Sequence, residues 1–224
     1  MLDMALRLFV ACFFVGSAIF FAEVARENKW VSGERARKVI HILIGIWGAW
    51  LPMWLTWRSI VALGLLLLIG SYISSKLLLF KSIHSVARQT VGEYLFPVSM
   101  VLLALFVRNE IIFAAAMLQL GIADGLAAVV GTRYGKRTQF KVLGFKKSWH
   151  GTITFFVCSM AILVWAIYAL QPTLAFATPV AAVVTVLISS GFATVLTLAE
   201  LSGIRGIDNV TVPALTAAGL WMIR

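Results

Sequence analysis

Residues 123–136, ADGLAAVVGTRYGK, place one carboxylate in an otherwise apolar stretch. Asp124 is followed by Ala127, Gly131 and Gly135 at spacings of three, four and four, so all four lie on one side of a continuing helix. Close packing of helices is an alternative explanation for the glycines. It does not explain Asp124, because a carboxylate within a membrane span costs about 2.5 to 3.5 kcal/mol and then faces protein or a water-filled cavity. We therefore predict a functional role for Asp124.

A basic segment follows, with the sequence TRYGKRTQFKVLGFKKSWHGT at residues 132–152. It holds six positive residues, no acid and three glycines, and Lys146, Lys147 and Ser148 directly precede a new apolar run. The amino end of a helix and two lysines favour an anion at residues 148–152, and phosphate is the obvious candidate. A polybasic loop that faces lipid headgroups is the alternative. Beside an intramembrane carboxylate, the segment fits a nucleoside triphosphate with Mg²⁺, which commonly binds carboxylates together with phosphate oxygens.

The chain that positions these residues is strongly apolar. Its 224 residues are 61% hydrophobic and 12% charged, with a mean hydropathy of +0.97. Such a composition excludes an ordinary soluble domain and predicts an all-α, polytopic membrane bundle that forms a single domain over residues 1–224. Eight apolar runs are candidate spans: 4–24, 38–57, 59–78, 94–107, 110–131, 152–170, 175–199 and 210–223. Seven spans remain an alternative, because two of the runs are short, and the five prolines are expected at or near the ends of the runs.

The charges support eight crossings. With alternating loops, one side collects all Lys and Arg residues except Arg7, Arg58, Arg108 and Arg224. This bias predicts that the rich side is cytoplasmic and that both termini lie opposite. The net charge of +10 thus marks a membrane face, and nucleic acid is not needed to explain it. All three histidines and most acids fall on the same face, which indicates a site there.

Further candidates lie near this face. Asp208 and Asn209 precede the last run as a second possible metal group, with a helix cap as the alternative. Glu93 begins a span, where a cap or the helix dipole explains it, whereas Glu200 ends one, where negative charge is unfavourable. The predicted metal ligands are therefore Asp124, Asp208, Asn209, Glu200 and Glu93.

Two groups of basic side chains complete the set. Arg37, Lys38 and His41 share one helix face at the start of the second run, where they would grip phosphate or an alcohol. Interfacial snorkelling of Arg37 and Lys38 is the alternative. His150 is a candidate general base, because an unperturbed imidazole titrates near neutral pH.

Together these residues resemble the CTP-dependent lipid kinases, which comprise dolichol kinase, phytol kinase and the CTP-dependent diacylglycerol kinase. The family signature runs Asp-x-x-Ala-x-x-x-Gly-x-x-x-Gly, then a basic spacer, then Lys-Lys-Thr-x-Glu-Gly or a Lys-Ser-x-x-Gly version. The matching residues are Asp124, Ala127, Gly131 and Gly135, followed by Lys146, Lys147, Ser148 and Gly151. RKVIHILIG, GEYLFP and DNVTVP resemble the phytol kinase branch, and the similarity spans residues 35–213. His150 stands where the dolichol kinase pattern has Glu, which also favours the phytol kinase-like branch.

The resemblance implies Mg²⁺-dependent transfer of the γ-phosphoryl group of CTP to the hydroxyl of a membrane lipid alcohol: phytol, a polyprenol or a related isoprenoid alcohol. We expect catalytic roles in this transfer for Asp124 and Lys147, and for His150 as the candidate general base. The residues expected to bind the nucleotide are Ala127, Gly131, Gly135, Lys136, Lys146, Lys147, Ser148, Gly151, Arg37, Lys38 and His41. Three alternatives stay open: a CTP-dependent diacylglycerol kinase, a phosphatidate cytidylyltransferase-like enzyme that releases pyrophosphate, and a small-molecule transporter. The transporter is disfavoured because the polar groups crowd one face and no internal repeat is visible.

Overall fold

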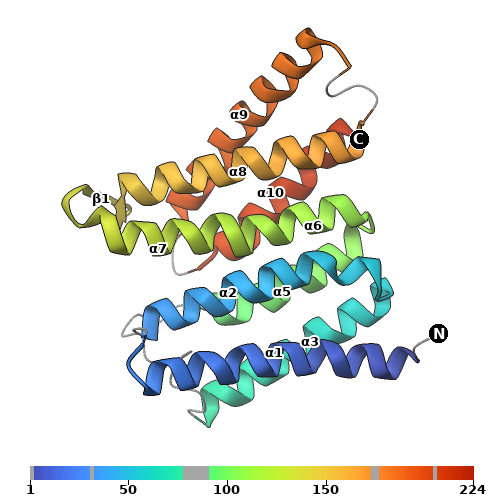
Figure 1. Ribbon diagram of the computed structural model, residues 1–224, viewed down its shortest axis with the longest axis vertical. Coiled ribbons are helices and arrows are strands. Elements are labelled where there is room, and N and C mark those ends of the chain that lie inside the picture. The colour runs from blue at the N-terminus through green and yellow to red at the C-terminus, as the bar shows by residue number, and fades with distance from the viewer. Residues whose placement is uncertain (1–2, 31–32, 78–90, 173–176, 204–205) are drawn as a thin grey trace.

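The computed structural model describes residues 3–30, 33–77, 91–172, 177–203 and 206–224, with the backbone alone for residues 33–37. The main elements are α1 (Met4–Glu27), α2 (Gly33–Trp50), α3 (Trp57–Lys76), α5 (Gly92–Phe106), α6 (Glu110–Leu118), α7 (Asp124–Tyr134), β1 (Gln139–Val142), β2 (Phe145–Ser148), α8 (Trp149–Leu170), α9 (Pro179–Ser202) and α10 (Asp208–Ile223). The helices lie side by side, except that α9 crosses its neighbours obliquely (Figure 1). The start of α1 and the end of α10 lie at the end of the bundle opposite the two strands (Figure 1).

Five helical stretches are long and apolar enough to cross a membrane. They are Met4–Glu27, Trp57–Lys76, Glu110–Arg137, Trp149–Leu170 and Pro179–Ser202. Shorter apolar helices cover Lys38–Met53 and Gly92–Phe106. Each of the eight predicted runs coincides with a helix or with the continuous α6–α7 stretch. The predicted all-α membrane fold is therefore confirmed.

Local capping explains where several helices begin and end. α2 ends at Trp50, before the predicted end at residue 57, because a 3₁₀ turn containing Pro52 follows it. α3 then begins after Thr56, whose Oγ1 accepts a hydrogen bond from the Ser59 N–H at 3.3 Å. Capping thus divides one apolar stretch into two helices and fixes the turn between them.

Two prolines lie inside helices, and for Pro97 and Pro213 the prediction of a position near a helix end is wrong. α5 and α10 begin at residues 92 and 208, earlier than their apolar runs, so each proline falls in the second turn. Proline has no N–H, so Pro213 leaves the carbonyl of Asn209 without its intrahelical donor. The Ser99 hydroxyl of α5 donates to that carbonyl. This bond ties the start of α10 to α5.

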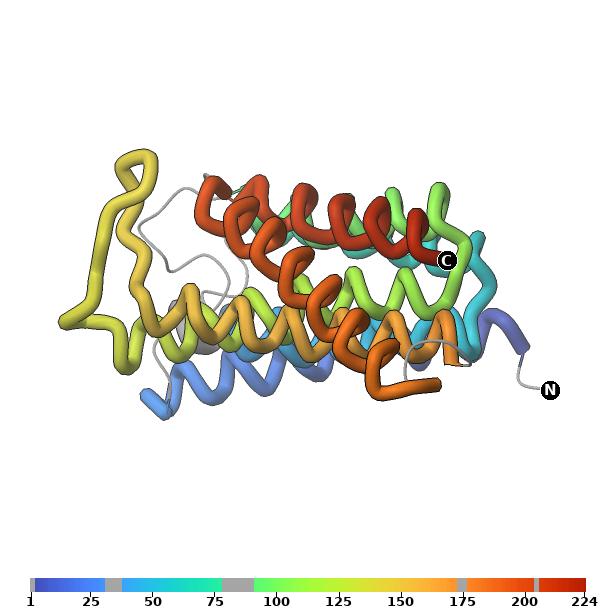
Figure 2. Tube along the Cα trace, turned by 90° about the horizontal axis from the view of Figure 1, so that it is seen from above, coloured from blue at the N-terminus to red at the C-terminus, as the bar shows by residue number. Residues whose placement is uncertain are grey.

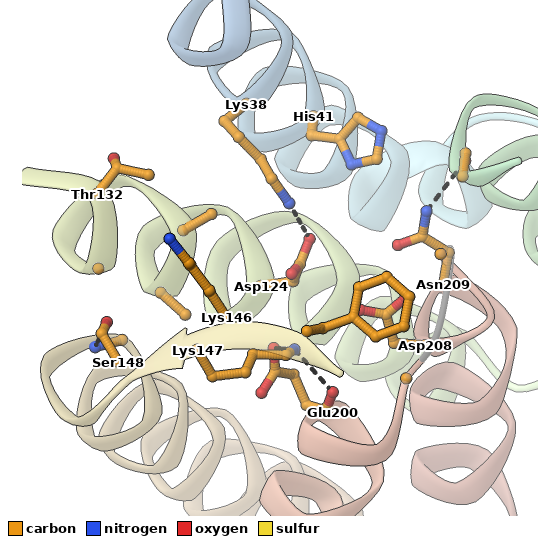
Figure 3. Close-up of a pocket in the computed structure, with 18 of the residues that line it drawn as sticks. Lys38, His41, Asp124, Thr132, Lys146, Lys147, Ser148, Glu200, Asp208 and Asn209 are labelled. Carbon is orange, nitrogen blue, oxygen red and sulfur yellow. Dashed lines mark hydrogen bonds and ion pairs between the residues drawn. The ribbon is translucent and has the colours of Figure 1, made fainter. Parts of the chain in front are cut away.

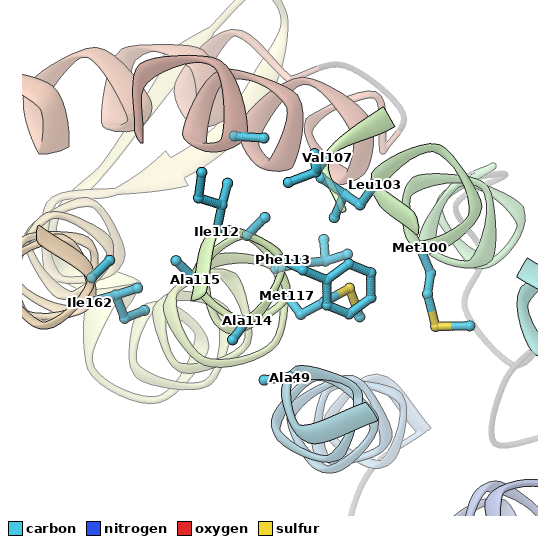
Figure 4. Packing of buried hydrophobic residues seen from close by; sticks show 14 of the residues in the cluster. Ala49, Met100, Leu103, Val107, Ile112, Phe113, Ala114, Ala115, Met117 and Ile162 are labelled. Carbon is cyan, nitrogen blue, oxygen red and sulfur yellow. The ribbon is translucent and has the colours of Figure 1, made fainter. Parts of the chain in front are cut away.

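The core forms around α6. Phe113, Ala115 and Met117 are fully buried, and α6 contacts α2, α5, α8 and α10. Ala49 of α2, Met100 of α5 and Ile162 of α8 surround it in Figure 4. A helix that is apolar on all sides is stable only when protein or lipid covers every face. Here the neighbouring helices supply that cover, and the chain continues from α6 through the turn Gln119–Ala123 into α7 at the site.

The basic segment folds as a β-hairpin rather than as the predicted loop. β1 and β2 pair antiparallel, with Gln139 opposite Ser148 and Lys141 opposite Lys146. Leu143 and Gly144 form the turn with positive φ angles of 49° and 83°, as a tight two-residue hairpin turn requires. Figure 2 shows the hairpin beside the helix ends at one end of the bundle. The hairpin brings its lysines back to the start of α8.

Candidate active site

A cavity of about 880 Å³ opens where the ends of α2, α5, α7, α9 and α10 meet the hairpin and the start of α8 (Figure 3). The predicted site residues that line it are Lys38, His41, Glu93, Asp124, Ala127, Gly131, Lys146, Lys147, Ser148, Gly151, Glu200, Asp208 and Asn209. They come from six helices and one strand, and from both ends of the sequence. The structure thus brings together most of the residues that the sequence singled out.

Three carboxylates form the centre of this cavity. One oxygen each of Asp124, Glu200 and Asp208 lies within 4.8 Å of the others. They belong to α7, α9 and α10, which are separate in the sequence. Carboxylates at this distance repel one another unless cations neutralise them. The cluster therefore requires positive charge.

Two lysines supply part of that charge. Lys38 Nζ donates to Asp124 Oδ2 at 2.7 Å. Lys147 Nζ forms an ion pair with the Glu200 carboxylate and also donates to the Glu200 carbonyl oxygen at 3.0 Å. That carbonyl lies at the end of α9, where a cation is favourable. Negative charge at the C-terminal end of a helix is unfavourable, as expected for Glu200 from the sequence, and Lys147 neutralises it here.

Asp208 differs from the other two carboxylates. Its Oδ1 is buried and has no hydrogen-bond partner among the residues that the structure describes. Its neighbour Asn209 is anchored: Nδ2 donates to the Gly92 carbonyl oxygen at 3.0 Å. This bond fixes the start of α10 against α5, while the Asp208 oxygen remains an unsatisfied acceptor beside two other acids. A buried acceptor of this kind is costly unless a donor or cation occupies the site.

A close helix contact sets the Lys38–Asp124 distance. A Cβ atom built on Gly45 of α2 would lie 2.4 Å from the Cα of Gly121, so the two backbones touch. Gly121 belongs to a π-helical turn, Gln119–Ala123, that directly precedes Asp124. Gly45 lies two turns beyond Lys38 on the same helix, and Gly121 lies three residues before Asp124. The contact thus holds α2 against α7, with the side chains of Lys38 and Asp124 facing each other.

The small-residue stripe of α7 packs against the start of α8. Ser148 caps α8, since its Oγ accepts from the Gly151 N–H at 3.2 Å. A Cβ atom on Gly131 would lie 2.8 Å from Ser148 Oγ, and one on Gly135 would lie 2.4 Å from the same atom. The two halves of the signature therefore contact each other directly. The stripe both packs helices and, at Ala127 and Gly131, borders the cavity.

Four residues that were predicted to belong to the site are not among those that the structure describes as lining the cavity. Gly135, Lys136 and His150 are not among the described residues that line the cavity. Gly135 is covered by Ser148, Lys136 is exposed in the turn after α7, and the exposed His150 Nδ1 lies 2.8 Å from Thr138 Oγ1. The side chain of Arg37 lies outside the described residues.

Several residues that line the cavity were not predicted from the sequence. Thr132, Gln139 and Phe145 are among them, whereas Thr152, which also lines the cavity, lies in the predicted anion segment 148–152. Gln139 is opposite Ser148 in the hairpin, and Thr132 directly follows Gly131. The alternation of apolar and polar residues at 139–142 was the available signal for the strand pairing that places Gln139 here.

The fold and the cavity together define an all-α membrane protein with an acidic and basic site at one end of its bundle. No protein-family model matches the chain, and no solved structure matches it. The chain is 32% identical to a phytol kinase of Synechocystis sp. (strain ATCC 27184 / PCC 6803 / Kazusa) over an alignment 232 positions long, which covers 97% of this chain and 93% of that protein. The chain belongs to the phytol kinase family.

Proposed function

We propose that this protein transfers the γ-phosphoryl group of CTP to the hydroxyl of an isoprenoid alcohol dissolved in the membrane. Support comes from the relative, which is named a phytol kinase, and from the cavity. In the transfer, a bond forms between the alcohol oxygen and the γ-phosphorus. The bond from that phosphorus to the bridging oxygen breaks, CDP leaves with the electron pair, and the hydroxyl proton passes to a cavity carboxylate.

The observation that carries this proposal is the juxtaposition of Asp124, Glu200 and Asp208 with Lys38 and Lys147. Phosphoryl transfer asks a protein mainly for positioning and for neutralisation of charge. Ammonium groups at the cavity wall are suited to phosphate oxygens, and the carboxylates are suited to a divalent cation. A transporter path would instead be expected to place its ionisable groups near the middle of the membrane.

The acidic cluster fits Mg²⁺. Three carboxylate oxygens within 4.8 Å of one another are hard oxygen ligands, and the buried Asp208 Oδ1 has no donor among the described residues. We assign Asp124, Asp208 and Glu200 as the groups that would hold the ion, with Asn209 and Glu93 at the border of the same cavity. When bound, Mg²⁺ would neutralise phosphate charge and orient the phosphate oxygens.

The phosphates of CTP would lie between Lys38, Lys147 and the start of α8. Lys146, Ser148 and Gly151 line the same wall, so the amino end of α8 and the hairpin lysines favour negative charge there. Lys136 and His150 are not among the described residues that line the cavity. We therefore assign the alcohol proton to a cavity carboxylate instead of to His150.

The direct test supplies purified protein with γ-labelled CTP or ATP, Mg²⁺ and a panel of lipid alcohols that includes phytol, a polyprenol and diacylglycerol. We expect label from CTP on an isoprenoid alcohol and release of CDP. Label from ATP alone would remove CTP from the proposal, and label on diacylglycerol alone would change the acceptor. Release of pyrophosphate with no labelled alcohol would support a cytidylyltransferase instead.

We also propose that the cavity opens to the cytoplasm. The basic residues of the loops near the cavity follow the bias of cytoplasmic loops. In a background without Cys12 and Cys158, Thr132→Cys and Ser202→Cys should react with an impermeant maleimide from the cytoplasmic side, and Arg58→Cys from the other side. Labelling of Thr132→Cys and Ser202→Cys from opposite sides would contradict the proposed layout.

A further inference from the structure

A second, apolar groove of about 240 Å³ lies between α1, α2, α3 and α5. Its walls are mainly aliphatic and include Val15, Ile40, Ile44 and Leu67. Gly70 of α3 also lines it, and a Cβ atom on Gly70 would meet nothing within 4 Å. The groove therefore has room for an apolar chain beside α3.

The groove meets the polar cavity at two side chains. His41 and Glu93 line both spaces. The His41 ring packs against Phe96, with 5.0 Å between the ring centroids, and Phe96 lines the groove. His41 also lies on the same helix as Lys38, whose ammonium contacts Asp124. One end of the groove is therefore polar and borders the cavity that holds the acidic cluster, and the rest is apolar except for Ser71 and Ser74 of α3.

We propose that this groove binds the hydrocarbon chain of the acceptor alcohol and that His41 and Glu93 hold its hydroxyl at the edge of the polar cavity. This inference rests on the proposed kinase function and adds the place and the polarity of the acceptor site. An amphiphile with one hydroxyl and a long apolar body matches a groove that is apolar along its length and polar at one end. The hydroxyl then faces the space assigned to the phosphates.

The shape of the groove matters more than its hydrophobicity. A lipid alcohol leaves a bilayer whose interior is already apolar, so transfer into the groove gains little from removal of water. Recognition must come from the fit of the chain against the groove walls and from the two polar groups at the junction. A side chain that occupies the groove should therefore weaken binding of the acceptor and leave the nucleotide unaffected.

The test fills the groove at Gly70. Gly70→Leu places a side chain in space that the structure leaves open, and Gly191→Leu on α9 is the matched control, because its Cβ atom also meets nothing within 4 Å and Gly191 borders neither space. We expect Gly70→Leu to raise the KM for phytol about tenfold or more and to leave the KM for CTP unchanged. Gly191→Leu should match the unsubstituted protein. Equal phytol KM values for the two variants, both folded, would overturn the inference.

A second measurement does not depend on turnover. A long isoprenoid alcohol that carries a photoreactive diazirine at its tail should label peptides of α1, α3 or α5 that line the groove, and excess phytol should suppress this labelling. Labelling confined to the outer surface of α8 or α9, or insensitive to phytol, would overturn the groove assignment. Groove labelling in a protein that transfers no phosphate would retain the groove and contradict the kinase proposal.

Discussion

Lys38 Nζ lies 2.7 Å from Asp124 Oδ2, although 86 residues separate the two in the chain. Their side chains are only 16% and 14% exposed, so water screens the pair weakly. The contact explains how Asp124 is accommodated beside an apolar span, because the ammonium balances its charge. It also places a cation beside the acid cluster, where we propose that phosphate oxygens bind.

Asp124→Asn should sharply reduce turnover and preserve the fold. The amide has nearly the same shape but no charge, so the cluster loses a metal ligand while the helix packing is kept. We expect kcat to fall by about 100-fold or more, a loss typical of removing one group that stabilises the transition state. The measurement is transfer of label from CTP to phytol, together with thermal unfolding in detergent.

The matched control is Glu110→Gln, which removes an exposed carboxylate in the first turn of α6. This variant should keep normal kcat. Normal turnover in Asp124→Asn would reduce Asp124 to a packing residue and contradict its proposed role.

Lys147→Met should weaken both nucleotide binding and the fold. The change leaves the buried Glu200 carboxylate without its cation, which we expect to lower the free energy of unfolding by about 1–3 kcal/mol. The KM for CTP should rise about tenfold or more, because a charged hydrogen bond to phosphate is lost. Steady-state kinetics and thermal unfolding measure the two effects separately.

The second substitution Glu200→Gln in the Lys147→Met protein should restore stability and leave the KM for CTP high. Lys141→Ala is the control, since Lys141 lies in the same hairpin and does not border the cavity. A Lys147→Met protein with an unchanged KM for CTP would contradict the assignment of Lys147 to the phosphates.

Asp208→Asn should reveal the metal site without an activity assay. In metal-free buffer its Tm should equal or exceed that of the unsubstituted protein, because the change removes one of three carboxylates that repel one another. Mg²⁺ should raise the Tm of the unsubstituted protein by binding the folded state, and this rise should shrink in Asp208→Asn. Glu110→Gln should respond to Mg²⁺ normally. An equal Mg²⁺ response in Asp208→Asn would contradict the metal assignment.

Gly131→Ala should disturb the contact between α7 and α8. Its new Cβ would lie 2.8 Å from Ser148 Oγ, and we expect the clash to cost about 1–3 kcal/mol of stability. Ser148→Ala removes that oxygen, so it should relieve the clash in the double variant, apart from its own loss of about 1 kcal/mol as a cap. Gly135→Ala would also contact Ser148 Cβ at 2.5 Å, so Ser148→Ala should not rescue it.

Thermal unfolding of the single and double variants measures this coupling, and Gly16→Ala, which meets no neighbour within 4 Å, is the control. Additive losses in the Gly131→Ala/Ser148→Ala protein would show that the two residues do not contact each other as described.

Properties that depend on local composition could be predicted from the sequence. The apolar runs are long enough to identify the spans, and the spacing of Ala127 and Gly131 placed them on one helix face. The π-helical turn before Asp124, the hairpin at 139–148 and the early start of α10 were not predicted. Each depends on packing or strand pairing that propensity and hydropathy do not report.

The sequence by itself determined that this is a helical membrane protein with an acid, Asp124, that needs compensation within the membrane. The tertiary structure decided which groups compensate it and which acids join it. Lys38, Glu200 and Asp208 converge on Asp124 because α2 packs on α7, α10 packs on the π-helical turn before Asp124, and α9 packs on α10. It also placed Gly135 against the Ser148 side chain and left His150 out of the set of described residues that line the cavity. Such contacts join residues far apart in the chain, and only the packing of the helices sets the distances between them.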